Sequence, residues 1–274
     1  MLDQLLGNFS YDFVRNAFYA GSIAAILGAV VGYFVIIRNV GFAAHALAHI
    51  GFTGATGAAL FGLSSLQGML FISCVAGALM GISGNKLHRS ELAVGMVLSF
   101  ALGVGTLFLA LYKGFAGQAT SILFGNIFGV SHAQIMATLV LAILSLAALA
   151  VFSRRLLFAS LLPELAESRG ISLTALSAAF MVILGIAVTL ASQVVGILLV
   201  FTLVIGPAGI AARFCRGFWS SMFFSILIGL FSVWAGILLA CASNWPPSFW
   251  ITAIIFALYL AGETLARYVL RLER

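Results

Sequence analysis

Two histidines, His45 and His49, stand four residues apart in the stretch HALAHIG (45–51), inside a long apolar run. On a helix, this spacing places both imidazoles on one face. Two neutral imidazoles can share a borderline-soft cation such as Zn²⁺. Two other interpretations stay open at this point: a helix–helix contact through buried imidazoles, and haem ligation. Because ionisable groups inside a membrane span are costly, the pair is a hypothesis for a functional site.

The composition of the chain indicates a polytopic membrane protein. Its 274 residues are 63% hydrophobic and 7% charged, whereas soluble domains are about 25% charged. The net charge of +6 does not indicate a nucleic-acid partner, because basic residues of membrane proteins gather in cytoplasmic loops. We expect an all-α integral membrane protein, surrounded by lipid, in which residues 1–274 form a single domain.

Apolar runs of about 20 residues predict transmembrane helices. Nine such runs occur, at residues 16–37, 40–62, 66–84, 91–112, 131–152, 172–190, 194–212, 217–241 and 248–267. A further stretch, SILFGNIFGVS (121–131), is apolar but too short to span. We expect it to re-enter the membrane or to lie at its interface.

The distribution of basic residues predicts the orientation. Nine spans place the two termini on opposite sides of the membrane. With the C-terminus in the cytoplasm, only Arg15 and Lys113 of the 13 lysine and arginine residues lie outside. Since basic residues favour the cytoplasmic side, we expect an outer N-terminus and a cytoplasmic C-terminus.

Glycine and proline positions predict how the helices meet and where one is interrupted. The small-xxx-small stretches GAVVG (28–32) and GALMG (77–81) predict close helix contacts. Gly206 and Pro207 lie within the seventh run, where we expect a kinked or broken helix. Such interruptions border the substrate path in many transporters, although a purely structural kink fits the sequence equally well.

The longest predicted cytoplasmic loop, residues 153–171, contains the signals of a short helix. Pro163 and Glu164 suit its first turn, and Gly170 suits its end. This helix either lies on the lipid or docks a cytoplasmic partner. The chain has no GxxxxGK[ST] phosphate loop. We therefore expect that it is not an ATP-hydrolysing enzyme, and that its energy comes from a partner subunit or an ion gradient.

Five stretches, in order along nearly the whole chain, resemble the permease subunits of bacterial ATP-binding-cassette (ABC) importers for zinc and manganese. AAHALAHIG (43–51) is similar to the family pattern GDALSHA, and LPELAESRG (162–170) to DPELARALG. VGILLVFTLVIGPAGIA (195–211) is similar to VGVLLVVALLVIPAATA. SELAVGMVLSFALGVG (90–105) and SILFGNIFGVS (121–131) also look like family segments. The resemblance implies a multi-pass protein of the bacterial cytoplasmic (inner) membrane.

The resemblance also implies roles for particular residues. His49 matches the histidine of the family's Asp-x-x-x-His pair, which is associated with the metal path. The family's coupling helix, which docks into the ATPase subunit, is matched by Pro163, Glu164, Leu165, Ala166 and Gly170. The implied assembly is a permease homodimer with two copies of a separate ATPase and an extracytoplasmic metal-binding protein. The metal ion is cargo, and no cofactor is implied.

Three residues depart from the family pattern: His45, Leu162 and Asn126 each stand where it has aspartate. At position 45 this removes a hard oxygen ligand, and imidazole suits zinc more than manganese. We therefore predict zinc as cargo, ahead of manganese or iron. Two alternatives are a proton-coupled secondary metal transporter, which would need mid-span carboxylates that the sequence lacks, and a membrane haem protein. A pair on one helix face cannot clamp one haem from both sides.

Overall fold

The computed structural model describes residues 11–88, 91–112, 116–215 and 217–272, and every regular element in these ranges is helical. The all-α fold class is confirmed. The long helices are α2 (Asp12–Ile37), α3 (Gly41–Leu60), α4 (Ser65–His88), α5 (Glu91–Leu111), α7 (His132–Leu161), α9 (Leu173–Val195), α10 (Val200–Phe214), α11 (Phe218–Ser243) and α12 (Pro247–Leu272). The short helices are α6 (Ala116–Phe124), η1 (Ile127–Gly129) and α8 (Pro163–Ser168).

Each of the nine predicted runs overlaps one long helix. In the described part of the chain, seven of these helices are long and apolar enough to cross a membrane. The other two are α10, which has only 15 residues, and α3, whose histidines and glycines lower its hydropathy. The chain is thus a multi-pass membrane protein, while nine spans and an outer N-terminus stay predictions.

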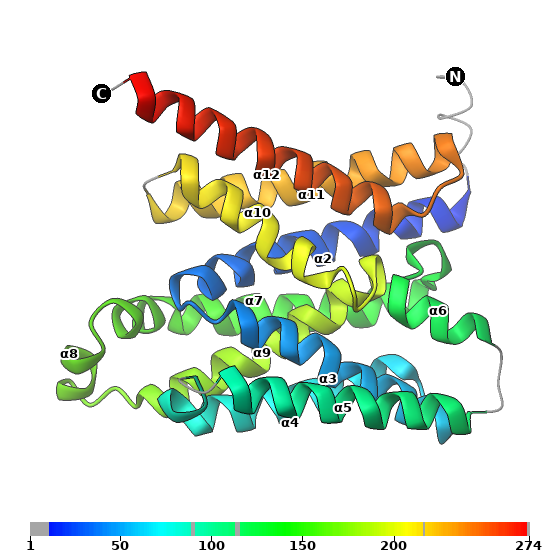
Figure 1. Cartoon of the computed structure of the whole chain (residues 1–274), viewed down its shortest axis with the longest axis horizontal. Helices are drawn as coiled ribbons and strands as arrows, with labels where there is room; N and C mark the ends of the chain where they lie inside the picture. Colours follow the sequence, from blue (N-terminus) through cyan, green and yellow to red (C-terminus); the bar gives the residue numbers. More distant parts are fainter. Residues whose placement is uncertain (1–10, 89–90, 113–115, 216, 273–274) are drawn as a thin grey trace.

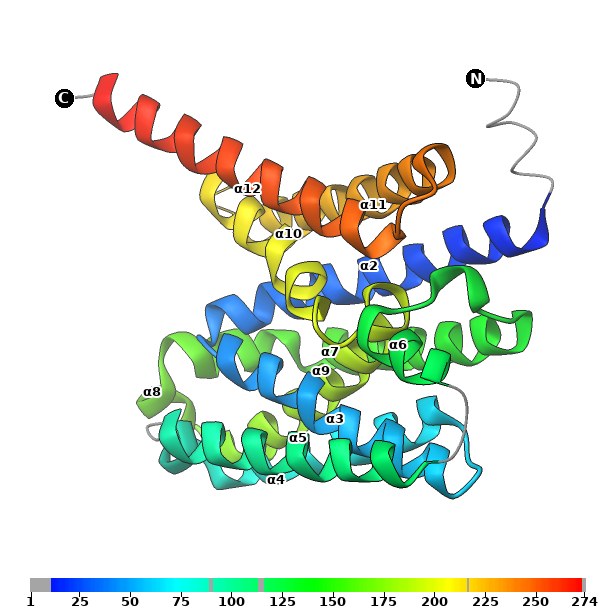
Figure 2. The same cartoon turned by 45° about the vertical axis from the view of Figure 1, so that its right-hand side comes forward.

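The long helices run roughly side by side and form a bundle with two distinct ends (Figures 1 and 2). One end carries α6 and the beginnings of α2 and α7, and we call it the α6 end. The other carries α8 and the last turns of α12, and we call it the α8 end. The first and last long helices therefore begin and finish at opposite ends, as an odd number of spans requires.

The helix that carries the histidine pair, α3, meets α4 backbone to backbone at Gly54 and Gly68. A Cβ on Gly54 would overlap the carbonyl oxygen of Gly68, and a Cβ on Gly68 would overlap that of Gly54. On the same helix, a Cβ on Gly51 would lie 2.6 Å from Ser73 Oγ. The glycines of α3 therefore serve close packing, which holds the helix in register with α4.

The close contacts predicted from the two small-xxx-small stretches are confirmed. Gly32 of α2 lies so near the carbonyl oxygen of Val204 that a Cβ would overlap it. Gly77 and Gly81 of α4 lie in the same way against the backbone of α9. These contacts join α2 to α10 and α4 to α9 at backbone distance.

The interruption predicted at Gly206 and Pro207 is not a helix break, because α10 continues through both residues. Buried Pro207 packs against α11 at Gly229, where an added Cβ would lie 3.7 Å from the proline Cγ, and neighbouring helices commonly support proline inside membrane helices. The chain instead breaks just before α10, at Gly196, whose φ is +84°. The seventh helix therefore begins at Val200 rather than at residue 194.

The predicted loop 153–171 is shorter than expected, because α7 extends to Leu161. α7 contains no glycine or proline before Pro163, and a proline disfavours helical backbone at the residue before it. Leu162 accordingly leaves the helix, with φ −135° and ψ 69°. The predicted short helix is confirmed as α8, with Pro163 in its first turn and Gly170, at φ +76°, after its end.

Candidate functional site

The two histidines of α3 meet as their spacing predicts. Their ring centroids lie 4.5 Å apart, with the ring planes at 75°. His49 is 8% exposed and His45 is half-buried. The buried Nδ1 atom of His49 has no hydrogen-bond partner. A buried polar atom left unpaired in this way calls for an explanation such as an ion that binds there.

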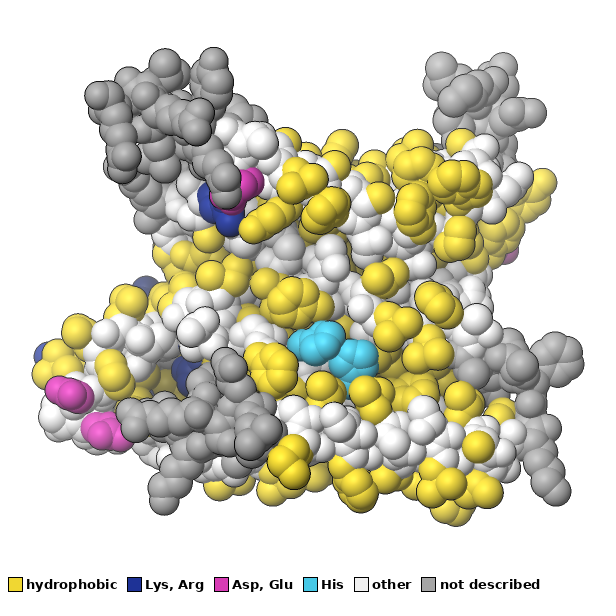
Figure 3. Space-filling model, viewed as in Figure 1, with side chains coloured by type: hydrophobic (Ala, Val, Ile, Leu, Met, Phe, Trp, Pro, Cys, Tyr) yellow, Lys and Arg dark blue, Asp and Glu magenta, His cyan; other side chains and the backbone are white. Residues whose placement is uncertain are grey.

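His45 lies in a groove that opens on the outside of the chain. This histidine groove is lined by Gly41, Phe42, His45, Leu198, Phe201 and Thr202, and has a volume of about 480 Å³. The Phe201 ring stands edge-on to His45, with centroids 5.8 Å apart. Figure 3 shows histidine side chains in the middle of this face, among hydrophobic side chains. The imidazoles are therefore reachable from outside one copy of the chain.

The break between α9 and α10 positions one wall of the histidine groove. Gly196 turns the chain so that Leu198 and Phe201 lie over the N-terminal half of α3. Sequence reasoning identified His45 but missed these two residues. The available signal was Gly196 in the stretch VGILL, since glycine is the residue that adopts positive φ without strain.

The histidine pair by itself has too few ligands for a metal site. Among the described residues, no group of three or more His, Cys, Asp or Glu side chains could hold a metal ion. His45 and His49 supply two nitrogen donors, whereas zinc generally takes four ligands. Two donors alone therefore do not make a zinc site within the described part of one chain.

The predicted helix-break residues lie in different places. Gly206 lines a groove of about 670 Å³ between α10 and α12, which shares Phe201 and Thr202 with the histidine groove. Pro207 is buried on the side of α10 that faces α11. Only Gly206 therefore borders the open face on which the histidines lie.

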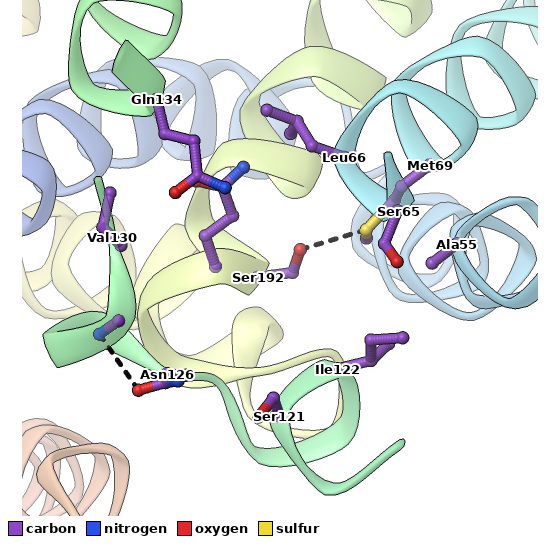
Figure 4. A pocket seen from close by; sticks show the side chains of 12 residues that line it. Ala55, Ser65, Leu66, Met69, Ser121, Ile122, Asn126, Val130, Gln134 and Ser192 are labelled. Carbon is purple, nitrogen blue, oxygen red and sulfur yellow. Dashed lines mark hydrogen bonds between the residues drawn. The ribbon is translucent and has the colours of Figure 1, made fainter. Parts of the chain in front are cut away.

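A separate polar cavity of about 220 Å³ lies at the α6 end (Figure 4). Its polar lining is uncharged and includes Ser65, Ser121, Asn126, Gln134 and Ser192. Ser192 Oγ donates a hydrogen bond to the sulfur of Met69 at 3.2 Å, and Asn126 Oδ1 accepts one from the Gly129 backbone at 3.1 Å. Because none of these groups is charged, this cavity offers water-binding groups rather than an anionic cation site.

The short helix α8 is fixed by one residue and exposes the rest. Ala166 is fully buried, whereas Pro163, Glu164, Leu165 and Gly170 are all exposed. The four exposed residues thus form a small surface at the α8 end, in which Leu165 is an apolar and Glu164 an acidic side chain.

Comparisons with known proteins agree with this architecture. The ABC 3 transport family matches residues 10–265. The manganese transport system membrane protein MntC of Halalkalibacterium halodurans is 27% identical, over 86% of this chain and 80% of its own. The manganese import system permease protein ScaB of Streptococcus parasanguinis is 26% identical, over 85% of this chain and 84% of its own.

The fold also matches a solved structure, PsaBC from Streptococcus pneumoniae in complex with Fab. The TM-score is 0.86 at 24% identity, over 96% of this chain and 95% of that one. The family match covers nearly the whole chain. The chain therefore belongs to the ABC 3 transport family, as a membrane-spanning permease subunit.

Proposed function

We propose that the chain is the permease of an ABC importer for a divalent metal ion, and that His45 and His49 contact the metal. The observation that carries this proposal is the imidazole pair on an open face of α3, with the buried Nδ1 of His49 unpaired. Relatives named for manganese transport support a metal cargo. An ABC family supports ATP-driven import over a proton-coupled carrier or a haem protein.

The permease works as a homodimer in this proposal. Ionisable residues within membrane helices rarely face lipid, and usually line a bundle interior or a water-filled path. The histidine groove is open in one copy. A second copy placed over this face would exclude lipid and bring two histidine pairs together. Four imidazoles then supply the number of ligands that zinc prefers.

Zinc is the proposed cargo because both donors are imidazoles, which suit zinc better than manganese. Manganese is a second candidate, because MntC and ScaB are named for manganese transport. Weak binding to two neutral donors per copy suits a path, since an ion must be able to leave as well as enter.

The proposed energy source is a separate ATPase, of which two copies dock on α8. The exposed residues Pro163, Glu164, Leu165 and Gly170 form the contact, and buried Ala166 holds the helix to the bundle. An extracytoplasmic metal-binding protein delivers the ion at the α6 end. This chain then carries no covalent chemistry, and lies in the bacterial cytoplasmic membrane.

Uptake by vesicles tests the proposal. The permease, its ATPase and its binding protein are reconstituted, and ATP-dependent entry of zinc and of manganese is measured separately. His49→Ala should lower uptake of the transported ion by about tenfold or more, as expected for loss of a ligand, while the ATPase still co-purifies. His132→Ala is the matched control, since His132 is an exposed histidine at the α6 end. Full uptake by His49→Ala would remove the pair from the mechanism.

A further inference from the structure

A second polar cavity, of about 410 Å³, lies at the α8 end and is separate from the histidine groove. Its walls come from the α2–α3 turn, α4, the last turns of α7, α8 and the beginning of α9. Two oppositely charged residues line it: Arg38 of the turn and Glu167 of α8. Nothing in the proposed metal path uses either residue.

Arg38 is half-buried and incompletely paired. Its guanidinium lies over the Phe180 ring, 5.3 Å from the centroid, and donates a hydrogen bond to Ser177 Oγ at 3.2 Å. Its Nε is buried without a hydrogen-bond partner. Within the described ranges of the chain, the ion pairs do not include Arg38. A buried cation without a counter-ion is costly, so this guanidinium has unused capacity to bind an anion.

Glu167 is the anion already present at the same cavity. It is exposed on α8 and takes part in none of the ion pairs between described side chains. The helix that carries it has six residues and one fully buried side chain, Ala166. Because both side chains line the same cavity and only one side chain of α8 is fully buried, we expect that a shift of α8 brings this carboxylate to the guanidinium. Its negative charge also disfavours a second, external anion in the cavity.

The turn that carries Arg38 leads directly into the histidine helix. It is tight: Asn39 has φ +53°, and Val40 N–H donates to the Val35 carbonyl at 3.0 Å. The next helix begins at Gly41, and His45 lies about 6 Å further along its axis. A movement imposed on Arg38 therefore reaches the N-terminal turn of α3 without a flexible linker between them.

We propose that Arg38 and Glu167 form an ion pair when the ATPase docks on α8, and that this pair repositions the beginning of α3 and its histidines. Arg38 is a positioning residue in this role, since it does not touch the metal. The inference rests on the proposed docking function of α8. It adds a specific route from that helix to the metal path.

Cross-linking measures the approach of the two side chains directly. Arg38→Cys and Glu167→Cys are combined in a chain whose Cys74, Cys215 and Cys241 are replaced by serine or alanine. Cross-link yield should rise about fivefold or more when ATPase and a non-hydrolysable ATP analogue are added, the size of a typical coupling effect. Arg38→Cys with Asp12→Cys, at opposite ends of the bundle, is the control and should stay unlinked. Equal yields with and without the ATPase would overturn the proposal.

Charge reversal separates an ion pair from a merely structural arginine. Arg38→Gln and Glu167→Gln should each lower the number of ions taken up per ATP hydrolysed, again by about fivefold, while ATPase co-purification is unchanged. The double variant Arg38→Glu, Glu167→Arg should recover much of that loss. Arg154→Gln, an exposed arginine of α7, is the control and should keep full coupling. A reversed pair without recovery, in protein that still binds ATPase, would contradict the ion pair.

Two further outcomes are informative. If wild-type permease does not bind the ATPase, the proposed docking function of α8 fails, and this inference fails with it. If docking is intact and only the cross-link or the charge reversal fails, the docking function stands and the Arg38–Glu167 pair does not. An uptake loss in Arg38→Gln that depends on anionic lipid in the vesicles would show that a lipid phosphate, not Glu167, is the counter-ion.

Discussion

The backbone N–H of Ile197 donates a hydrogen bond to the carbonyl oxygen of Ile122 at 3.3 Å, and so joins the break between α9 and α10 to the end of α6. The next pair, Leu198 N–H to the Leu123 carbonyl, also measures 3.3 Å. Because Leu198 lines the histidine groove, α6 supports one wall of that groove from the other side of the broken segment.

Replacing Gly196 tests this crossing. Gly196→Ala places a side chain at φ +84°, where its Cβ would overlap the Leu123 carbonyl. Backbone with φ +84° and ψ 164° is essentially restricted to glycine, and it costs another residue about 1–3 kcal/mol. We therefore expect a lower melting temperature of the purified permease in detergent.

Gly95→Ala is the matched control, since a Cβ at Gly95 meets no atom within 4 Å of the described structure. It should leave the melting temperature unchanged or raise it slightly, because alanine favours helix. Equal melting temperatures for the two variants would mean that the crossing does not constrain position 196.

The course of single helices could be predicted from the sequence, whereas the interruptions could not. Apolar runs, Pro163 and the small-xxx-small stretches act locally, so the all-helical class, the positions of the long helices, α8 and the close helix contacts were predicted correctly. Pro207 of the continuous helix α10 packs against α11 at Gly229, and the break at Gly196 is joined to α6 by hydrogen bonds. These partners are distant in the sequence, and local signals do not reveal them.

The same distinction applies to the site. Helical spacing was enough to predict that His45 and His49 share a face. The edge-on contact of Phe201 with His45, and the position of Arg38 over Phe180, each join two different helices or a helix and a turn. Only the packing of α3, α9 and α10 brings these residues together, so they could not be found from spacing alone.

The contact between α3 and α4 should tolerate no side chain. Gly54→Val would push its methyl groups into the Gly68 backbone and separate the two helices. Overpacking of this kind costs about 1–3 kcal/mol, and we expect lower yield and a lower melting temperature. Gly103→Val is the control, because a Cβ there meets no described atom within 4 Å. A fully stable Gly54→Val would show that this contact can relax.

An ion pair between Arg213 and Glu263 joins α10 to α12. Arg213 also donates a hydrogen bond to the Tyr259 hydroxyl at 3.0 Å. Both charged side chains are about one-third exposed, so we expect a coupling of only about 0.5–1 kcal/mol. Melting temperatures of Arg213→Gln, Glu263→Gln and the double variant measure it. Strictly additive shifts would mean that the pair contributes no stability.

The docking surface of α8 should respond to charge reversal. Glu164 is exposed beside Pro163, at the positive end of the helix. Glu164→Lys removes an acidic contact and introduces a like charge against any basic partner, which should weaken ATPase co-purification by about tenfold. Asp12→Lys, an exposed acid at the α6 end, is the control and should bind ATPase normally. Unaltered co-purification of Glu164→Lys would count against docking on α8.

Selectivity should depend on the residue at position 45. His45→Asp replaces an imidazole with a carboxylate. It leaves the second imidazole, that of buried His49 on the next turn of α3, in place. A carboxylate is a harder ligand and carries negative charge, so the ratio of manganese to zinc uptake should rise by about tenfold. Both ions are offered together to the same vesicles, because a ratio does not depend on how much permease is inserted. His132→Asp controls for added charge and should keep the wild-type ratio. If His45→Asp transports normally at an unchanged ratio, selectivity resides in the metal-binding protein rather than in this pair.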